Sequence, residues 1–499
     1  MRRRTPRFLV PHFDRWLTTL ATTASPLGRT LVRALDRFYP RAAARIRMRQ
    51  GGISNAYTLA KKSGDTRIIQ RLGEMQELLA APLGEDIAQA RRFSNVFEPK
   101  ALHVFHSSIT HDTNGYGVRS EQLIAALQDI GICCAAMTRL GYPWDLRQHA
   151  KLSEQSTQSS SSTIRYLHSR SNTWTLGDCE SGYLRAYAEQ IEIAASTAQA
   201  SVIHAHSNYL NGLAAQIAGQ RLSVPVVYEM RGLWHETRAL TNPSYATTEH
   251  YRYCEKQELR AAMLADAVVA ISKPLADWLA IKGVNRSKIT TIGNAAVERR
   301  PVEKQASPEF VIGYVGSLVE YEGIDVLLAA FTELHKLHDQ VRLVIVGDGA
   351  QRKTIENWVR AHDLAGRVTL PGRVPPGQVE DYYARFDVAV VPRNSNKVTE
   401  LVPPLKPMEI MAMGVPLVVS NVAPLSELVT HESNALVFAA GDVADLMRCI
   451  QKLVHQPDLG AKLRAAGLVS ASNNSWARNA QRYLTLYKQF GREGSSDQI

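Results

Sequence analysis

Short apolar segments alternate with amphipathic helical patterns through most of this chain, and that alternation restricts the fold more than any other feature of the sequence. A first series of strand-like segments lies at residues 101–105, 130–136, 201–205, 224–229 and 267–271. A second series lies at residues 310–315, 342–346, 367–370, 388–391 and 417–420. Strands that alternate with helices in this way are typical of parallel, doubly wound sheets.

A polar segment with two prolines, residues 299–308, separates the two series and predicts a linker. We therefore expect one α/β domain at residues 98–300, a second at residues 309–472, and a C-terminal helix and tail at residues 473–499. Open α/β sheets bind ligands at the carboxyl ends of their strands. Two such domains should therefore hold a ligand in a cleft between them.

The pattern of residues 1–97 predicts a basic, amphipathic helical extension. Apolar residues recur at helical spacing, at Phe13, Trp16, Leu17 and Leu20 and again at Leu27, Leu31, Leu35 and Phe38. Arg29, Arg33 and Arg37 lie opposite the second group, and residues 1–50 carry nearly all of the net charge of +11. The extension fits either an anionic membrane surface or an ordinary helix that packs on the protein with a solvated basic face. The sequence leaves both open.

Other properties of the chain exclude several classes of protein. No run of about eighteen uncharged apolar residues predicts a membrane-spanning helix. The five cysteines show no Cys-x-x-Cys spacing, so neither a disulfide framework nor a zinc site is expected. Polar residues interrupt the N-terminal segment, so a cleaved signal is not expected. The setting that fits best is cytoplasmic, with or without peripheral attachment to the inner face of the cell membrane. Outside residues 1–50 the chain is nearly neutral, so no nucleic-acid partner is expected.

Residues 153–163 are rich in serine and predict a loop or a disordered insertion.

The densest group of chemically suggestive residues lies at residues 392–416, where a strand end, a polar loop and a helix start follow one another. A helix N-terminus offers unpaired N–H groups that suit a diphosphate, and Lys406 would add a positive charge beside it. Glu409, one turn further on, could accept the two hydroxyls of a ribose. Arg393 and Glu400 lie on the loop that would face a transferred sugar.

This segment resembles the donor-binding signature of the retaining family-4 glycosyltransferases (glycosyl transferases group 1). The signature has two glutamates that flank a Pro-Leu run, followed by Glu-x-Met-Ala-x-Gly-x-Pro, as in residues 409–416 here. The resemblance implies that Glu400 contacts the donor sugar and that Glu409 holds the ribose. Eight residues separate the two glutamates here, where the family usually has seven. The implied fold is GT-B: two facing Rossmann-like domains, here with a helical N-terminal extension.

Further segments of the second domain match the family in the same order. Gly316 and Ser317 end the first strand, where backbone amides can approach a phosphate. Gly347 lies in the following glycine-rich turn, and Gly372 and Arg373 begin the segment whose backbone reads the nucleobase in the family. The family's arginine and lysine after the first turn are missing, and Arg393 and Lys406 are the candidates to replace them.

In the first domain, Gly115 and Gly117 resemble the family's glycine loop before the first helix. His206 corresponds to the strand-end histidine that reaches the transferred sugar, whereas His204 fits ordinary packing. Glu229 and Arg231 end the next strand, where either a role on the acceptor side or a structural ion pair is possible. We expect no metal at the two histidines, because the sequence near them holds no carboxylate or cysteine that completes a ligand set.

The resemblance implies transfer of a sugar from a nucleotide-sugar donor to a saccharide or lipid-linked saccharide, with retention of configuration and without a metal or other cofactor. A sugar-nucleotide epimerase on the same fold is one alternative. A degenerate, membrane-associated transferase without activity is another, because the arginine–lysine pair is missing.

Overall fold

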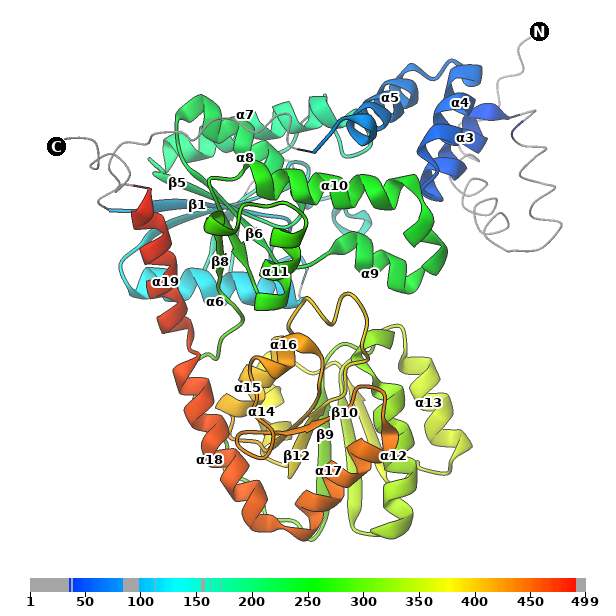
Figure 1. Cartoon of the computed structure of the whole chain (residues 1–499), viewed down its shortest axis with the longest axis vertical. Coiled ribbons are helices and arrows are strands. Elements are labelled where there is room, and N and C mark those ends of the chain that lie inside the picture. Colours follow the sequence, from blue (N-terminus) through cyan, green and yellow to red (C-terminus); the bar gives the residue numbers. More distant parts are fainter. Residues whose placement is uncertain are drawn as a thin grey trace.

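The computed structural model describes residues 36, 39–83, 98–112, 114–153, 158–161, 163–171 and 173–490. These residues form two α/β domains that stand end to end, with three helices of the N-terminal region packed on the first domain (Figure 1). The expected arrangement of two facing Rossmann-like domains is therefore confirmed. Among the helices described, none has both the length and the hydrophobicity needed to cross a membrane.

The first domain is built on a sheet of eight strands in the order β3-β4-β2-β1-β5-β6-β7-β8. All neighbouring strands are parallel except β3 and β4. The strands are β1 (Lys100–Phe105), β2 (Cys133–Thr138), β3 (Gln158–Ser160), β4 (Arg165–Leu167), β5 (Val202–His206), β6 (Val226–Met230), β7 (Ala267–Ala270) and β8 (Ile289–Thr291). The helices are α6 (Gly115–Asp129), α7 (Glu180–Thr197), α8 (Tyr209–Leu222), α9 (Trp234–Thr241), α10 (Glu249–Leu264) and α11 (Lys273–Ile281).

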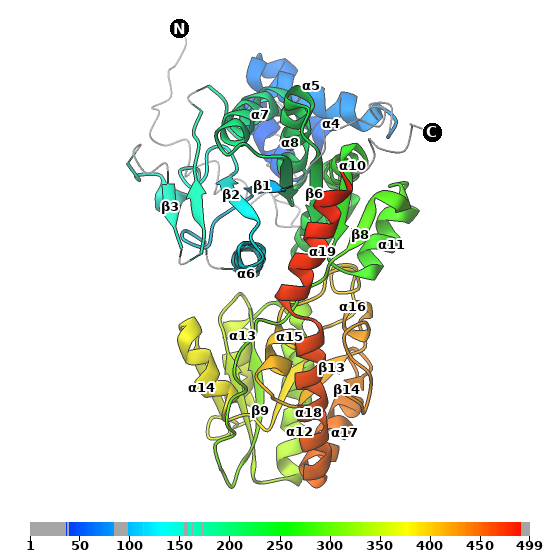
Figure 2. The ribbon, with the colours of Figure 1, turned by 90° about the vertical axis from the view of Figure 1, so that its left-hand side faces the viewer.

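Alternate residues of the central strands face two different helical layers, since successive side chains of a strand point to opposite faces. Ile203 and Tyr228 belong to the core beneath α7, α8 and α10. Val202 and Val227 belong to the core beneath α6 and the C-terminal helix α19 (Trp476–Gln489). Figure 2 shows α6 and α19 on one side of this sheet, with α7 and α8 on the other. Burial on both faces explains why these strands are apolar runs without simple alternation.

The second domain has a sheet of six parallel strands in the order β11-β10-β9-β12-β13-β14. The strands are β9 (Phe310–Val315), β10 (Val341–Val346), β11 (Val368–Gly372), β12 (Val388–Val391), β13 (Leu417–Ser420) and β14 (Leu436–Phe438). The helices are α12 (Ile324–Leu337), α13 (Arg352–Ala361), α14 (Val379–Tyr383), α15 (Lys406–Ala412), α16 (Ala423–Ser426), α17 (Val443–His455) and α18 (Pro457–Asn473). Their apolar faces cover both sides of the sheet.

The chain returns to the first domain at its C-terminal end. Helix α18 is the last helix of the second domain, and α19 then packs against α6 of the first domain (Figure 2). At the crossing, the amide of Ala296 donates to the carbonyl of Asn474 at 2.8 Å, and the amide of Trp476 donates to Ala296 at 3.1 Å. The sequence predicts a C-terminal helix but not that it belongs to the first domain's core.

Three helices of the N-terminal region lie against the first domain: α3 (Pro40–Arg49), α4 (Ile53–Ser63) and α5 (Thr66–Ala80). Ile46, Ile53 and Leu72 join the same apolar cluster as α7 and α10. The apolar stripes expected between Phe13 and Phe38, and Arg29, Arg33 and Arg37, lie outside the described residues.

The serine-rich segment contains a short strand where the sequence predicts only a loop. Strand β3 pairs antiparallel with β4 and forms the edge of the sheet. The Ser159 hydroxyl also lies 2.7 Å from Nε2 of His168 and 2.8 Å from Oγ1 of Thr110. These contacts give a polar segment a place at the sheet edge that hydropathy alone does not indicate.

Candidate functional site

An open pocket of about 540 Å³ lies in the second domain at the carboxyl ends of β9 and β10. Its lining includes Gly316, Ser317, Gly347, Asp348, Arg373 and Lys406. Five of these residues are expected from the sequence to bind a nucleotide sugar, and they come from four separate segments of the chain. The fold therefore brings most of the expected donor site together.

Glycine is required where the turns after β9, β10 and β11 meet. Gly347 has a φ of +147°, and a Cβ on it would lie 1.8 Å from the carbonyl oxygen of Gly316. Its amide donates to the carbonyl of Gly372 at 2.9 Å, and the amide of Gly316 donates to Val346 at 3.0 Å. The floor of the pocket is thus made of backbone from adjoining turns, into which a side chain at residue 347 would not fit.

Lys406 and Glu409 form an ion pair on helix α15 at the rim of this pocket. The Lys406 ammonium lies 3.0 Å from Oε2 of Glu409, and both side chains are about one-third exposed. Lys406 and Arg373 supply positive charge to the pocket lining. Glu409 thus adjoins one of the two cations of the pocket, although it is not itself part of the pocket lining.

Arg393 does not take the place predicted for it. Its side chain is buried, with Nη1 donating to the carbonyl of Val402 at 2.7 Å and Nη2 lying 3.1 Å from Oε1 of Glu322. Glu322 belongs to the segment that replaces the family's arginine and lysine. The acidic substitution therefore neutralises Arg393, and the prediction that Arg393 serves as a diphosphate cation is wrong. Arg373, which the sequence assigns to the nucleobase side, is the second cation of the pocket.

Glu400 is held on its loop by two hydrogen bonds. Its Oε1 accepts from the Ser395 hydroxyl at 2.6 Å, and its Oε2 accepts from the amide of Ala423 at 2.9 Å. The carboxylate is therefore fixed in orientation, although it is not part of the pocket lining.

The segment between Glu400 and Glu409 reaches across to the first domain. The Ser272 hydroxyl donates to the carbonyl of Leu401 at 2.6 Å, and Nδ2 of Asn294 donates to Pro403 at 3.0 Å. A Cβ on Gly115 would lie 3.4 Å from Cδ1 of Leu405. The extra residue in the spacing thus belongs to a segment that docks on the other domain, and Gly115 lies at the boundary between the two domains. Gly117 instead packs on Ile109 within the first domain.

His206 and Glu229 lie in the interior of the first domain and have no exposed surface. Both point to the sheet face that α6 and α19 cover. Oε1 of Glu229 lies 3.1 Å from Nε of Arg119 and 2.7 Å from Nε of Arg231. This geometry therefore contradicts direct contact of His206 or Glu229 with a sugar. It also contradicts an acceptor-side role for Arg231. The structural ion pair is the alternative that the structure favours for Glu229 and Arg231.

Two partners in this network cannot be recognised from the sequence motifs. Arg119 of α6 also donates to Asn294 Oδ1 at 2.9 Å, and the Tyr483 hydroxyl of α19 donates to Oε2 of Glu229 at 2.6 Å. Burial alone would raise the pKa of Glu229, but the charges of Arg119 and Arg231 hold that pKa well below its usual value. The network joins two helices, α6 after the glycine loop and the C-terminal helix α19, to the end of β6.

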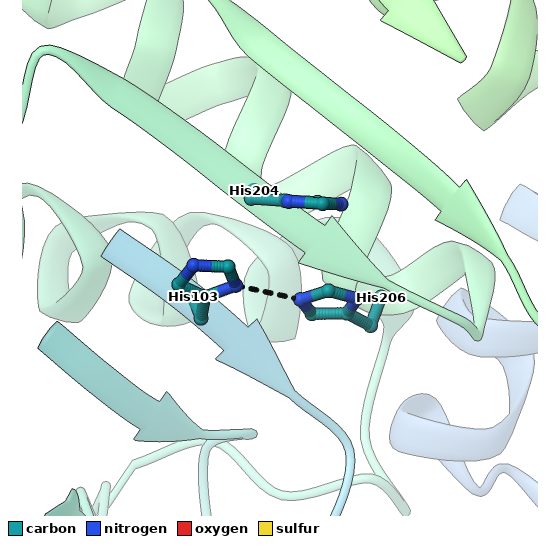
Figure 3. Close-up of side chains that lie close together, drawn as sticks. All are labelled: His103, His204 and His206. Atoms are coloured by element: carbon teal, nitrogen blue, oxygen red, sulfur yellow. Dashed lines mark hydrogen bonds between the residues drawn. The ribbon is translucent and has the colours of Figure 1, made fainter. Parts of the chain in front are cut away.

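A third histidine joins His204 and His206 (Figure 3). His103 of β1 pairs in register with His204 of β5, and the ligand nitrogens of the three imidazoles lie within 4.8 Å of one another. The expectation that no further ligand lies near the two histidines is therefore wrong, because both His103 and Glu229 adjoin them.

The hydrogen bonds of this cluster nevertheless fit imidazoles that are hydrogen-bonded to one another better than imidazoles that bind a metal. Nη2 of Arg231 donates to Nδ1 of His206 at 2.8 Å, so Nε2 of His206 carries the proton and donates to Nδ1 of His103 at 3.0 Å. Burial lowers the pKa of all three imidazoles, which keeps them neutral at neutral pH. Two arginines beside one carboxylate would also oppose a divalent cation.

Comparison with known proteins places this geometry in a family. Residues 114–295 match the Glycosyl transferase 4-like domain, and residues 297–468 match the Glycosyl transferases group 1. The chain belongs to the group 1 glycosyl transferases. Its two domains thus correspond to the two halves of a glycosyltransferase of the GT-B fold.

Curated glycosyltransferases resemble the chain over part of its length. An uncharacterized glycosyltransferase of Haemophilus influenzae is 28% identical over 146 residues, which are 29% of this chain and 39% of that protein. Glycogen synthase of Mycobacterium tuberculosis is 25% identical over 57% of this chain and 68% of its own length. D-inositol 3-phosphate glycosyltransferase of Rhodococcus jostii is 25% identical over 58% of this chain and 66% of its own length.

Solved structures share the fold. Sucrose-phosphate synthase from Thermosynechococcus elongatus superposes with a TM-score of 0.63 at 21% identity, over 79% of this chain and 98% of that one. HepE from Anabaena, in complex with UDP, gives a TM-score of 0.59 at 18% identity, over 78% of this chain and 100% of that one.

A second contact between the domains of this glycosyltransferase is an ion pair between Lys397 and Glu236 of α9. The Lys397 ammonium also lies 3.2 Å from the Tyr251 hydroxyl and 3.9 Å from Glu255. Burial would raise the pKa of Glu236, but hydrogen bonds from His235, Lys397 and Tyr251 lower it to about 2. Glu236 is therefore charged at neutral pH.

The variant Lys397→Glu is expected to open the glycosyltransferase, because it places a third carboxylate beside Glu236 and Glu255. At this half-exposed position the closed arrangement should lose at least about 1 kcal/mol. Small-angle scattering should show a larger radius of gyration, whereas Lys397→Gln should show a smaller change in the same direction. An unchanged scattering profile for Lys397→Glu would contradict the role of this contact.

Proposed function

We propose that this glycosyltransferase moves a hexosyl group from a nucleoside-diphosphate sugar to a saccharide or lipid-linked saccharide, in polysaccharide or glycolipid synthesis. The single observation that carries the proposal is the pocket in which the Gly316 and Gly347 turns, Arg373 and Lys406 converge, with Glu409 beside Lys406. HepE, which shares the fold, has been solved with UDP and with UDP-glucose. That similarity supports a nucleotide sugar as the donor.

In the proposed mechanism, the diphosphate lies against the backbone turns at Gly316 and Gly347. Lys406 and Arg373 stabilise the negative charge that the leaving diphosphate gains as its bond to the sugar breaks. Glu409 accepts hydrogen bonds from the ribose hydroxyls and orients Lys406 through their ion pair. Side-chain cations supply the charge, and the chain contains no Asp-x-Asp sequence to hold a metal.

Retention of configuration is proposed from family membership. The acceptor oxygen forms its bond to the anomeric carbon on the face from which the diphosphate departs. A phosphate oxygen of the departing diphosphate takes the proton of the acceptor hydroxyl. Glu400, fixed by Ser395 and Ala423, is the proposed contact to the donor sugar. The buried network around Glu229 positions the first domain for this reaction through Arg119 and α6.

Nucleotide binding can be tested by thermal unfolding with uridine, guanosine and thymidine diphosphates. One of them is expected to stabilise the folded chain by about 2.7 kcal/mol at a hundredfold excess over its Kd. Binding of none of the three would favour the alternative of a degenerate scaffold and overturn the proposal.

Acceptor dependence separates transfer from epimerisation. With the nucleotide sugar that binds, we expect sugar release into product only when a saccharide acceptor is present. Conversion of the nucleotide sugar into an isomer without acceptor would establish the epimerase instead. The anomeric configuration of the product, measured by NMR, tests retention.

A further inference from the structure

A second hollow of about 390 Å³ lies far from the donor pocket along the chain, between α3, α5 and the turn that precedes α7. Its lining contains five arginines and two aspartates: Arg41, Arg45, Arg49, Arg67, Arg71, Asp65 and Asp178. No described residue of this hollow belongs to the donor pocket. The fold thus concentrates positive charge outside the donor pocket.

The arginines gather because two amphipathic helices turn their basic faces to the same space. On α3 the arginines recur every four residues, at 41, 45 and 49, whereas Ala43, Ala44 and Ile46 are buried on the other side. On α5, Arg67 and Arg71 have the same spacing, and Leu72 and Met75 are buried. Residues four apart lie on one helical face. Packing of the apolar faces therefore sets two arginine rows beside one hollow.

The two aspartates of the hollow already serve the backbone and a hydroxyl. Asp65 caps α5 by accepting from the amide of Ile68 at 3.3 Å, and its other oxygen accepts from Nε of Arg41 at 2.7 Å. Asp178 accepts from the amide and hydroxyl of Thr175 at 2.9 and 2.8 Å, and its contact with Arg67 is 3.8 Å long. The lining therefore keeps an excess of positive charge.

Arg71 is held at the hollow by a backbone contact. Nη1 of Arg71 donates to the carbonyl of Gly177 at 3.0 Å, which ties α5 to the turn. The guanidinium group is planar and binds phosphate oxygens through two parallel hydrogen bonds. A cavity of this size accommodates a small charged group of a larger ligand.

We propose that this arginine hollow binds a diphosphate group, distinct from the diphosphate of the donor. The lining carries five arginines against two aspartates, a formal excess of three positive charges, and a diphosphate offers two groups of oxygens to the two arginine rows. The diphosphate has two possible sources: a soluble diphosphate or the headgroup of a lipid-linked saccharide. This proposal does not depend on the proposed transfer reaction.

The first test measures binding of inorganic pyrophosphate to the full chain by calorimetry, in a Lys406→Ala background that weakens the donor pocket. Arg45→Glu combined with Arg67→Glu places one negative charge on each helix and is expected to weaken this binding at least tenfold. Arg448→Glu, on an arginine of α17 that is 67% exposed, is the matched control and should leave the affinity unchanged. Equal affinity in the double variant and the control would overturn the proposal.

A second variant guards against a folding defect. The side chain of Arg67 is 85% exposed, so Arg67→Glu alone should fold normally, and we expect it to weaken pyrophosphate binding about fivefold. If the unmodified chain binds pyrophosphate in the hollow but binds no nucleotide, the proposed function is contradicted and this inference stands.

Vesicles distinguish the two sources of the diphosphate. Phosphatidylcholine vesicles that contain a polyprenyl diphosphate should bind the chain more tightly than plain phosphatidylcholine vesicles if the ligand is lipid-linked, and Arg45→Glu with Arg67→Glu should remove the difference. If the double variant loses pyrophosphate binding and the unmodified chain shows no preference for the diphosphate vesicles, the result supports a soluble ligand. A vesicle preference that survives in the double variant, together with unchanged pyrophosphate affinity, would contradict both sources.

Discussion

Replacement of Lys406 by alanine is expected to lower kcat/KM for sugar transfer by at least about 100-fold while the fold remains intact. Removal of one preorganised group that stabilises developing charge typically costs two to three orders of magnitude in rate. Lys406 lines the pocket beside Arg373, where the leaving diphosphate gains charge. Because Arg393 is already paired with Glu322, it cannot compensate for the loss.

Glu409→Ala tests the other half of the same ion pair. The loss of ribose contacts should raise KM for the donor, and the freed lysine should also lower kcat. Lys336→Ala is a suitable control, because Lys336 pairs with Glu333 three residues away at 2.8 Å, with the same helical spacing in the reverse order and outside the pocket. Steady-state kinetics with equal rates for Lys406→Ala, Glu409→Ala and Lys336→Ala would refute the donor site.

Replacement of Glu229 by glutamine should destabilise the first domain by about 3–5 kcal/mol, because it leaves two buried guanidinium groups without a counter-charge. Arg119 and Arg231 both bond to this carboxylate, and Tyr483 donates to its second oxygen. Urea unfolding of the wild type and of Glu229→Gln measures the difference. Glu333→Gln, at a half-exposed surface pair, should change the stability by less than about 1 kcal/mol.

The pH dependence of stability provides a second measure of Glu229. Its pKa in the folded chain is lowered well below the value expected in the unfolded chain, so the unfolded state binds more protons as the pH falls. The stabilisation is fully present above about pH 4.3 and is lost as the pH falls from there towards the folded-state pKa. Glu229→Gln should lack this component, so its stability should fall less steeply below pH 4.3. Parallel pH profiles would show that the carboxylate is not charged in the fold.

The fold and much of the donor pocket follow from local features of the sequence. Each strand of the second domain is a compact apolar run, and Gly316, Gly347 and Lys406 lie at the ends or starts of elements that such runs define. The motif order therefore predicts that these residues meet. The role predicted for Arg393 is wrong because its partner Glu322 lies more than seventy residues upstream. No local pattern indicates that the two will pair.

The first-domain site is less predictable because it depends on side-chain direction and on a distant helix. His206 and Glu229 end adjacent strands, which suggests that they face the cleft. The two-residue period of a strand instead directs both side chains towards α6 and α19. That face is closed by Tyr483 and Tyr487, which return from the C-terminal end of the chain. His103 becomes visible as a neighbour only once the register of β1 against β5 is known.

The two passages of the chain between the domains have a mechanical consequence. Ala296 on the first passage is hydrogen-bonded to Asn474 and Trp476 on the second, so the domains are joined at one edge by a pair of mutually braced segments. Figure 1 shows α18 and α19 along that edge, with α9, which carries the partner of Lys397, on the other side of the molecule. A rotation about the braced edge would separate the far edge most, and there the ion pair between Lys397 and Glu236 joins the two domains.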